Sequence, residues 1–260
     1  MDLQSIRYAA GERTARITLN RPATHNALDD TIVAELTTAF IAAARDPGVK
    51  VVILAGAGPA FCAGIDPAYH QHMSTLDLEQ NRSDSQRLAT LLRTIYEIRK
   101  PVCALVHGPA LGFGCGLAVV CDLVLASRDR ARFAIPEVQT GMVPALVAPY
   151  LVKRIGEGRA REVILRGNTL TATEAQGMGL ITAAVPDDQL EKKGTALITE
   201  LVNACSSSAM SMAKDLLGKL NGMNGSDAVD FTINVHAAAR MTADCRKGAQ
   251  AIINDQEPGW

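Results

Sequence analysis

Three apolar stretches constrain the fold most strongly, because each is continuous and does not alternate with polar residues. They cover residues 50–55, 101–106 and 123–126. A strand with one face in water alternates apolar and polar side chains, whereas a strand buried on both faces is apolar along its length. Each stretch therefore predicts a strand in the interior of the molecule.

Helical patterns lie between these strands. A helix capped by Asp29 or Asp30 carries apolar residues at helical spacing and ends near residues 46–48, and a second covers roughly 86–99. Residues 6–19 predict a β-hairpin ahead of the first helix. The alternation of strands and helices predicts an α/β fold.

The pattern after Pro144 is helical. Helices are predicted at 188–204, 208–221, 226–243 and 244–254, and a capping box at 171–174 precedes a shorter helix. We therefore divide the chain into a core of residues 1–195 and a helical region of residues 196–260. Amphipathic helices with little core of their own are expected to pack on another surface, typically that of a neighbouring subunit.

Composition excludes several classes of function. With 260 residues, 48% hydrophobic residues and 20% charged residues, the chain is typical of a globular protein with one main domain. A net charge of −1 argues against nucleic acid as a partner. The 6 cysteines form no Cys-x-x-Cys pair, so neither zinc nor a redox pair is indicated. The first residues lack a secretory signal, and we expect a cytoplasmic location.

Two segments need a separate interpretation. Residues 101–121 carry no formal charge and are long enough to raise the question of a membrane span. Prolines and glycines interrupt them and Asp122 closes them, so a buried strand, loop and helix is the better prediction. Residues 67–85 are polar and irregular, and we expect a mobile surface segment that could act as a lid.

The segment 110–122 has the strongest chemical signal. Glycines at 112, 114 and 116 let backbone approach a ligand closely and leave N–H groups at the start of a helix. Such N–H groups suit an anion or an oxyanion. The spacing and mid-chain position differ from those of a dinucleotide-binding loop. A glycine seam for helix packing stays open as an alternative.

Two further motifs carry candidate groups. Residues 61–66 follow a strand and form a turn in which the N–H of Ile65 could face a ligand, although a simple turn explains them as well. Glu137 has no cation near it in sequence until Lys153. A carboxyl group in apolar surroundings has a raised pKa, which suits general acid–base chemistry. A surface glutamate after a turn is the alternative.

Other signals are weaker. His70 and His72 could suggest a metal pair, but no third ligand lies near them in sequence, so we expect a solvated loop and no metal site. No Gly-x-Ser-x-Gly motif is present, and serine-hydrolase chemistry has no support.

Taken together, the motifs resemble those of the crotonase (enoyl-CoA hydratase/isomerase) family. The resemblance covers roughly residues 5–255 and is specific as a set. The matching pieces are Leu19-Asn-Arg-Pro22, Asn26-Ala-Leu28, Val51-Val-Ile-Leu-Ala-Gly56, Phe61-Cys-Ala-Gly-Ile-Asp66, Lys100-Pro101, Gly108-Pro-Ala-Leu-Gly112, Cys121-Asp122, Ala131-Arg-Phe133, Pro136-Glu137, Gly141, Gly167, Ala175, Gly179-Leu180 and Val185-Pro186.

The resemblance implies a spiral of ββα units with a C-terminal helical region, assembled as a homotrimer or homohexamer. It implies an acyl-CoA thioester as substrate, with no other cofactor. The thioester oxygen would lie between the backbone N–H groups of Ile65 and Phe113, and Glu137 would be the catalytic acid or base. Phe113 replaces a more usual glycine and should narrow the pocket. The substrate- or CoA-binding positions implied are Arg21, Ala27, Ala63, Gly64, Asp66, Gly112, Gly116 and Met142.

Departures from the family pattern point to a subgroup. Typical hydratases have two glutamates, and the first of them falls on Gly116. The usual Pro-Gly-Ala-Gly-Gly-Thr run is replaced by Pro144-Ala-Leu-Val-Ala-Pro149. Both changes look like those of branched glutaconyl-CoA hydratases with one catalytic glutamate. His70 and Asp84 are candidates for the missing acid.

The C-terminal end departs as well. It lacks the Lys/Arg cluster that is common before the final aromatic residue, which puts a CoA phosphate contact from this end in doubt. Arg21 is the candidate substitute near the adenosine side.

The resemblance therefore predicts an enoyl-CoA hydratase that adds water to a 2,3-double bond. A 3,2-enoyl-CoA isomerase using the same glutamate is the main alternative. Thioester hydrolysis, decarboxylation and a non-catalytic acyl-CoA-binding scaffold stay open.

Overall fold

The computed structural model describes residues 3–220 and 222–260, and its centre is the sheet predicted from the apolar stretches. The sheet has six strands in the order β1-β2-β3-β4-β6-β9, and only the β1–β2 pair is antiparallel. The hairpin and the three interior strands are confirmed. The bounds are β1 Ile6–Gly11, β2 Thr14–Leu19, β3 Val51–Gly56, β4 Val102–Val106, β6 Leu123–Ser127 and β9 Ala183–Val185.

The interior strands are apolar throughout because both of their faces are covered. In β3, Val52 and Leu54 join the main core under the helices that flank one face of the sheet. Val51 and Ile53 point to the other face and pack with Ile198 of α7 (Leu190–Ala204). The period-2 geometry of a strand sends neighbouring residues to opposite faces, so a continuous apolar stretch serves two cores.

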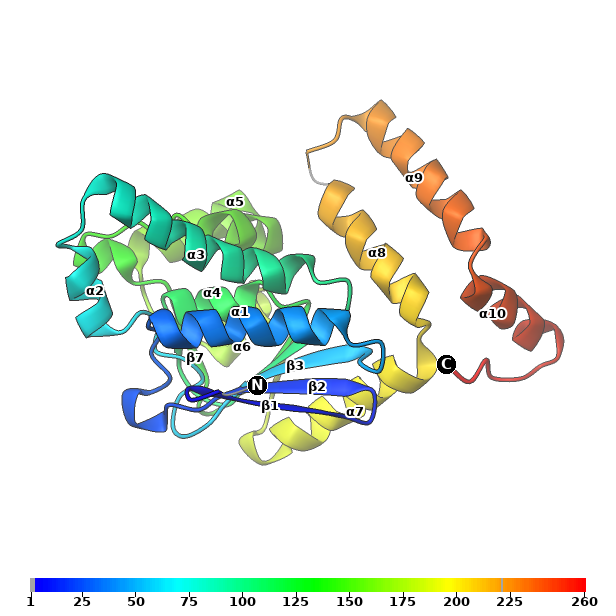
Figure 1. Cartoon of the computed structure of the whole chain (residues 1–260), viewed down its shortest axis with the longest axis horizontal. Coiled ribbons are helices and arrows are strands. Elements are labelled where there is room, and N and C mark those ends of the chain that lie inside the picture. The colour runs from blue at the N-terminus through cyan, green and yellow to red at the C-terminus, as the bar shows by residue number, and fades with distance from the viewer. Residues whose placement is uncertain (1–2, 221) are drawn as a thin grey trace.

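The other elements surround this sheet (Figure 1). A second sheet of three strands has the order β5-β7-β8. The bounds are α1 Asp30–Arg45, α2 Pro67–Met73, α3 Leu78–Glu97, β5 Ala110–Leu111, α4 Phe113–Val119, β7 Arg132–Ala134, α5 Ala148–Arg166, β8 Leu170–Thr171, α6 Ala172–Gly177, α8 Ser207–Leu220, α9 Gly225–Arg240 and α10 Ala243–Ile253, with short 3₁₀ turns at Pro22–Thr24, Glu137–Thr140 and Asp187–Gln189.

The first helix begins as predicted. Asp29 is the N-cap of α1, and its side chain accepts a hydrogen bond from the backbone N–H of Ile32. Such a cap satisfies one of the free N–H groups of the first turn. The helix ends at Arg45, directly before the predicted stop at residues 46–48.

The prediction of an irregular segment at residues 67–85 is wrong. Residues 67–73 form α2, and α3 begins at Leu78, eight residues before the predicted start at 86. A capping box of Asp77 and Gln80 starts α3. The first two turns of α3 bury only Asp84, so they lack the apolar stripe on which the prediction relied.

A buried polar cluster attaches α2 to the rest of the chain. Tyr69 is the buried residue of α2, and its hydroxyl donates a hydrogen bond to Asp84 of α3, which is 4% exposed. Arg87 holds the same carboxylate at 2.5 Å and also contacts Asp30 of α1 at 2.8 Å. Burial and the bond to Asp84 raise the pKa of Tyr69. Tyr69 therefore anchors this segment to α3.

The helical prediction for the second half missed two strands. The two-residue β8 pairs with β7, and β9 joins the edge of the main sheet beside β6. β9 has the sequence Ala-Ala-Val and is half-buried. A strand of three residues has no detectable alternation, and the pairing along β6 decides its conformation.

The C-terminal helices divide into two groups. α7 packs on the sheet, and the predicted boundary at 195/196 lies within it. In contrast, α8, α9 and α10 extend away from the sheet (Figure 1), and α8 and α9 bury no residue. We call residues 207–253 the arm. Several large apolar side chains on it are exposed, namely Leu217, Val229, Ile233, Met241, Ile252 and Ile253.

Hydrogen bonds hold the arm at its base and at the C-terminal residues that follow it. At its base, Asp244 of α10 accepts hydrogen bonds from the hydroxyls of Ser206 and Ser208, at 2.6 and 2.7 Å. These bonds lower the pKa of Asp244. At the C-terminus, the carbonyl of Trp260 accepts a hydrogen bond from Arg13 in the β1–β2 turn, at 2.5 Å. Within the described residues no helix is long and apolar enough to cross a membrane.

The anchor of α2 is open to a direct test. Tyr69→Phe removes the hydroxyl and leaves Asp84 with Arg87 alone, so we expect a loss of about 1–2 kcal/mol in the free energy of unfolding. Urea denaturation measures this loss, and hydrogen exchange should show faster exchange in α2. The matched control is Tyr96→Phe, because Tyr96 packs on the ring of Tyr150. Equal stability of the two variants would contradict the anchor.

Candidate active site

Two loops from distant parts of the sequence lie against each other. Cys62 forms an isolated parallel bridge with Ala110. Its N–H donates to the carbonyl of Pro109 at 3.1 Å, and its carbonyl accepts from the N–H of Leu111 at 2.9 Å. The loop after β3 and the start of α4 are therefore joined through their main chains.

Glycines allow this close approach. A Cβ atom on Gly64 would lie 2.7 Å from the carbonyl oxygen of Leu111, and one on Gly114 would lie 2.3 Å from that of Cys62. Real side chains do not tolerate such distances. Gly64 also has φ +92°, which favours glycine. Of the three glycines predicted to let the backbone approach a ligand, Gly114 is in close contact with the facing loop.

The N–H groups of Ile65 and Phe113 point away from their own loops. The carbonyl of Gly64 accepts from the N–H of Leu28 at 2.8 Å, and the carbonyl of Gly112 accepts from that of Gly116 at 3.1 Å. In a trans peptide the N–H opposes the carbonyl, so the N–H groups of the following residues face the other way. Within the described residues neither N–H has a partner.

The backbone at Gly64 also lies close to the N–H group of Phe113. A Cβ atom built on Gly64, the residue before Ile65, would lie 3.6 Å from the nitrogen of Phe113. Phe113 is the first residue of α4, where the helix dipole is positive. The arrangement can hold an oxygen atom that carries negative charge.

The side chain of Asn26 holds the loop after β3 through hydrogen bonds to its main chain. It is 0% exposed, and its side-chain nitrogen donates to the carbonyls of Ala57, Ala60 and Phe61 at 2.8–3.1 Å. Its side-chain oxygen accepts from the N–H of Arg21 at 2.8 Å. In the sequence, Asn26 is visible only as part of a motif, because an amide with several main-chain partners leaves no periodic or spacing signal.

Glu137 lies beside these loops. A Cβ atom on Gly112 would be 3.0 Å from Oε1 of Glu137. Gly112 has φ +53° and its N–H donates to the carbonyl of Ala134 at 2.8 Å, which holds this loop next to β7. Glu137 begins the 3₁₀ turn Glu137–Thr140, and Met142 closes the turn by donating its N–H to the carbonyl of Glu137 at 2.9 Å.

The carboxyl group of Glu137 lies in surroundings that would suit proton transfer. Its Oε2 is buried and has no hydrogen-bond partner within the described residues. Burial raises the pKa of Glu137 above its usual range. A buried carboxyl group without a partner is costly, and it persists where a ligand or a reaction uses it.

Gly116 does not leave an empty space. Its Cα faces Val147, and a Cβ atom at 116 would lie 2.6 Å from Cγ2 of Val147. Val147 is 2% exposed and belongs to the main core. The position where typical hydratases have their first glutamate is therefore covered by an isopropyl group. Sequence reasoning noted the altered 144–149 run but had no signal for this contact.

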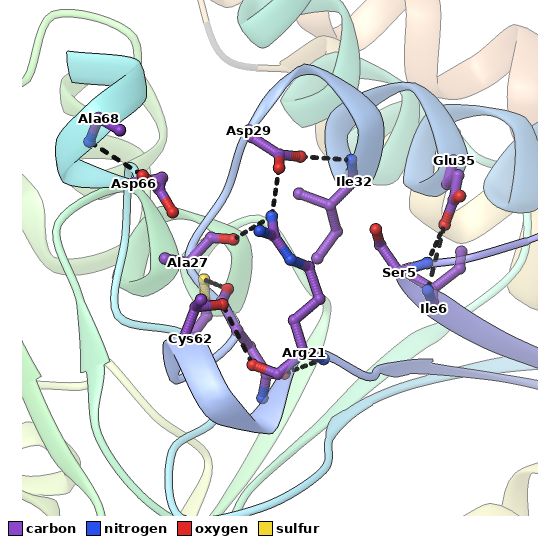
Figure 2. Close-up of polar contacts among 12 residues, drawn as sticks. Ser5, Ile6, Arg21, Ala27, Asp29, Ile32, Glu35, Cys62, Asp66 and Ala68 are labelled. Carbon is purple, nitrogen blue, oxygen red and sulfur yellow. Dashed lines mark hydrogen bonds and ion pairs between the residues drawn. The ribbon is translucent and has the colours of Figure 1, made fainter. Parts of the chain in front are cut away.

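Arg21 is engaged within its own segment (Figure 2). Its guanidinium forms an ion pair with Asp29, the N-cap of α1, and donates to the carbonyl of Ala27 at 3.4 Å. Ala27 is buried, while Ala63 is half-buried and donates its N–H to the carbonyl of His25. Asp66 caps α2 through the N–H of Ala68 at 2.9 Å.

The remaining predicted residues differ in exposure. Met142 is 45% exposed and lies in the turn that follows Glu137. Asp84 is buried in the Tyr69 and Arg87 cluster, which commits its carboxylate to the packing of α2. His70 is a half-buried residue of α2. Within the described residues no group of three His, Cys, Asp or Glu side chains could hold a metal ion.

Two thiols flank the site and stay protonated at neutral pH. Burial raises the pKa of Cys62 to about 12, and burial together with Glu137 raises the pKa of Cys115 to about 12. A thiol is a good nucleophile only as a thiolate, so neither is suited to covalent catalysis. Neither thiol is therefore a candidate nucleophile, and Glu137 is the candidate for proton transfer at this place.

The sequence and the fold both match known proteins. The family described as enoyl-CoA hydratase/isomerase matches residues 10–260. A Thermus thermophilus protein provisionally named an enoyl-CoA hydratase is 34% identical over 244 residues, which are 94% of this chain and 96% of that protein. The 2,3-dehydroadipyl-CoA hydratase of Escherichia coli is 29% identical over 250 residues, which are 96% and 95% of the two chains.

Solved structures agree. An enoyl-CoA hydratase of Mycobacterium smegmatis has a TM-score of 0.92 at 30% identity, over 99% of both chains. One from Shewanella pealeana has a TM-score of 0.94 at 27% identity, over 100% of this chain and 97% of that one. The predicted α/β crotonase fold with C-terminal helices is confirmed. The chain is an enzyme of the enoyl-CoA hydratase/isomerase family, also called the crotonase family.

Proposed function

We propose that this enzyme is an enoyl-CoA hydratase that works with one carboxyl group, Glu137. The observation that carries the proposal is the buried, unpartnered Oε2 of Glu137, next to a pair of outward-facing N–H groups. The homologues named as hydratases support the same reaction type, and the family acts on CoA thioesters.

The two N–H groups would act on the thioester carbonyl. With its oxygen between the N–H groups of Ile65 and Phe113, electron density moves from the double bond toward that oxygen. C3 becomes electrophilic, and the developing enolate charge is stabilised. Fixed donors of this kind are worth about 2.7–4 kcal/mol each in comparable sites. They use only backbone, so Phe113 in place of glycine is compatible with the role.

Glu137 would move the proton. As the oxygen of water bonds to C3, the carboxylate takes a proton from that water, and C2 receives a proton as the enolate collapses. One carboxyl group can perform both transfers in turn. Its raised pKa, caused by burial, brings its proton affinity closer to neutral pH, where such exchange is most efficient.

A 3,2-enoyl-CoA isomerase is the second candidate, and one contact favours it. Val147 covers Gly116, so a second carboxyl group from that position is sterically excluded. Migration of a double bond from C3–C4 to C2–C3 needs only one group that removes a proton from C2 and returns it to C4. The proposal also includes the acyl group. We propose a branched glutaconyl type, because the residues at 116 and 144–149 resemble those of that subgroup.

We also propose a homotrimer or homohexamer with the arm as its contact. Val229 and Ile233 lie four residues apart on α9, on one face, and are 57% and 59% exposed. Exposed apolar stripes of this kind mark interaction surfaces. The fixed base and end of the arm would present that face in one orientation.

Isotope labelling separates the candidate reactions. The protein is incubated with 2-enoyl-, 3-enoyl- and 3-methylglutaconyl-CoA thioesters in ¹⁸O-labelled heavy water, and the product masses are read. Gain of labelled water identifies a hydratase, and the best substrate identifies the acyl class. Deuterium uptake with a shifted double bond identifies an isomerase. Binding without any turnover would contradict both and support an acyl-CoA-binding scaffold.

Glu137→Gln tests the role of the carboxyl group. The amide keeps the shape and loses the proton transfer, so we expect turnover to fall by about 10²–10⁴-fold with little change in thioester binding. The matched control is Glu157→Gln, an exposed residue of α5 paired with Arg161. Full activity of Glu137→Gln would remove Glu137 from the mechanism.

The raised pKa of Glu137 also predicts a pH-dependent stability difference. Below the usual pKa of a glutamate, about 4.3, folded and unfolded forms are both protonated and ionisation costs nothing. As pH rises through the raised pKa of the folded state, the ionised carboxylate destabilises the wild type. We expect Glu137→Gln to be more stable than the wild type at neutral pH, with the gap closing in acid. Urea denaturation over a pH series measures the gap, and a pH-independent gap would contradict the raised pKa.

Introducing charged residues on α9 tests whether the arm forms the contact between subunits. Val229→Glu with Ile233→Glu should lower the particle mass measured by light scattering, because two carboxylates would be buried in the contact. Leu165→Glu is the control, since Leu165 is 70% exposed on α5, outside the arm. A monomeric wild type, or an arm variant with unchanged mass, would contradict the proposed assembly.

A further inference from the structure

Two glycines at the start of α4 are covered by two different groups. Gly112 is the N-cap residue and Gly116 lies in the first turn, and the N–H of Gly116 donates a hydrogen bond to the carbonyl of Gly112 at 3.1 Å. Glu137 covers the first with its carboxyl group, and Val147 covers the second with its isopropyl group. The carboxyl group and the isopropyl group therefore contact the same turn of the chain.

Val147 cannot leave its place easily. It is 2% exposed, its N–H donates to the carbonyl of Pro144 at 3.1 Å, and its carbonyl accepts from the N–H of Leu151 at 3.0 Å. A β-branched side chain has few rotamers. The Val147 side chain is thus a fixed part of the wall of the site, by which we mean the groups that cover the start of α4.

We propose that Val147 is a specificity-determining residue that sets the ratio of water addition to double-bond migration. The inference rests on the proposed function and concerns the same site. The isopropyl group fills the space that a second carboxyl group at position 116 would take, and it offers a water molecule no hydrogen bond there. An apolar group at this position favours proton transfer between carbons over water addition.

The two reactions differ in what the wall must hold. In migration, Glu137 removes a proton from C2, the double bond moves from C3–C4 to C2–C3 through the enolate, and Glu137 returns the proton to C4. In hydration, a water molecule must also be held while its oxygen bonds to C3 and one of its protons is removed. A polar group on the wall assists only the second reaction.

Paired substitutions test the inference. Gly116→Glu alone would collide with Val147, and we expect its Tm to fall by more than about 5 °C. Gly116→Glu with Val147→Gly provides room for the carboxyl group and should recover part of that loss. In this double variant, hydration relative to migration should rise by about tenfold or more, because a second proton-transfer group typically contributes at least 10²-fold. Rates of both reactions are measured on one preparation.

Two single substitutions separate polarity from packing. Val147→Thr keeps the shape and adds a hydroxyl that can bind water, so the same ratio should rise with a smaller loss of activity. Val163→Ala is the matched control, because Val163 is also 2% exposed in the same core and lies on α5. Val163→Ala should lower Tm because it leaves a cavity in that core, while the ratio of hydration to migration stays at the wild-type value.

Each outcome has a defined meaning. A raised ratio in the folded double variant and in Val147→Thr supports the role of Val147. A folded, thioester-binding double variant with a wild-type ratio overturns it, and the same holds if Val163→Ala shifts the ratio equally. If the wild type shows no turnover, or if its turnover does not depend on Glu137, the proposed function itself is overturned. Failure of that function is thus distinguished from failure of the inference.

Discussion

The side-chain amide of Asn26 is the interaction on which the site depends. It joins the turn before α1 to the loop after β3 through three carbonyls and one N–H. Main-chain groups buried without partners are costly, and Asn26 satisfies several at once at 0% exposure. Leu28, two residues later, then holds the carbonyl of Gly64 and so sets the direction of the Ile65 N–H.

The sequence predicted the elements whose signals are local. The interior strands and the capped α1 are confirmed, because an apolar stretch and an Asp cap are visible in a short window. The start of α3 was missed because its first turns are polar, and β9 was missed because three residues carry no pattern. In both cases the deciding contacts come from elsewhere in the chain.

In the candidate site, too, local signals were visible in the sequence and contacts between distant residues were not. The glycines at 112, 114 and 116 indicated a close approach of backbone, and Glu137 was recognised as a carboxyl group in apolar surroundings. The contact between Gly116 and Val147 links residues that are 31 positions apart, and no spacing rule indicates it. The commitment of Asp84 to Tyr69 likewise became visible only once α2 and α3 were placed.

The meeting of residues 62–65 with residues 109–113 is made by peptide groups, and the side chains there are mostly small. Peptide groups are common to all residue types. Most single-residue replacements therefore leave these main-chain contacts intact, as long as the glycines stay. A lineage can then exchange surface and core side chains extensively without rebuilding the centre. Homologues near 30% identity with TM-scores above 0.9 are what such tolerance produces: the main chain is inherited, and the side chains around it are free to drift.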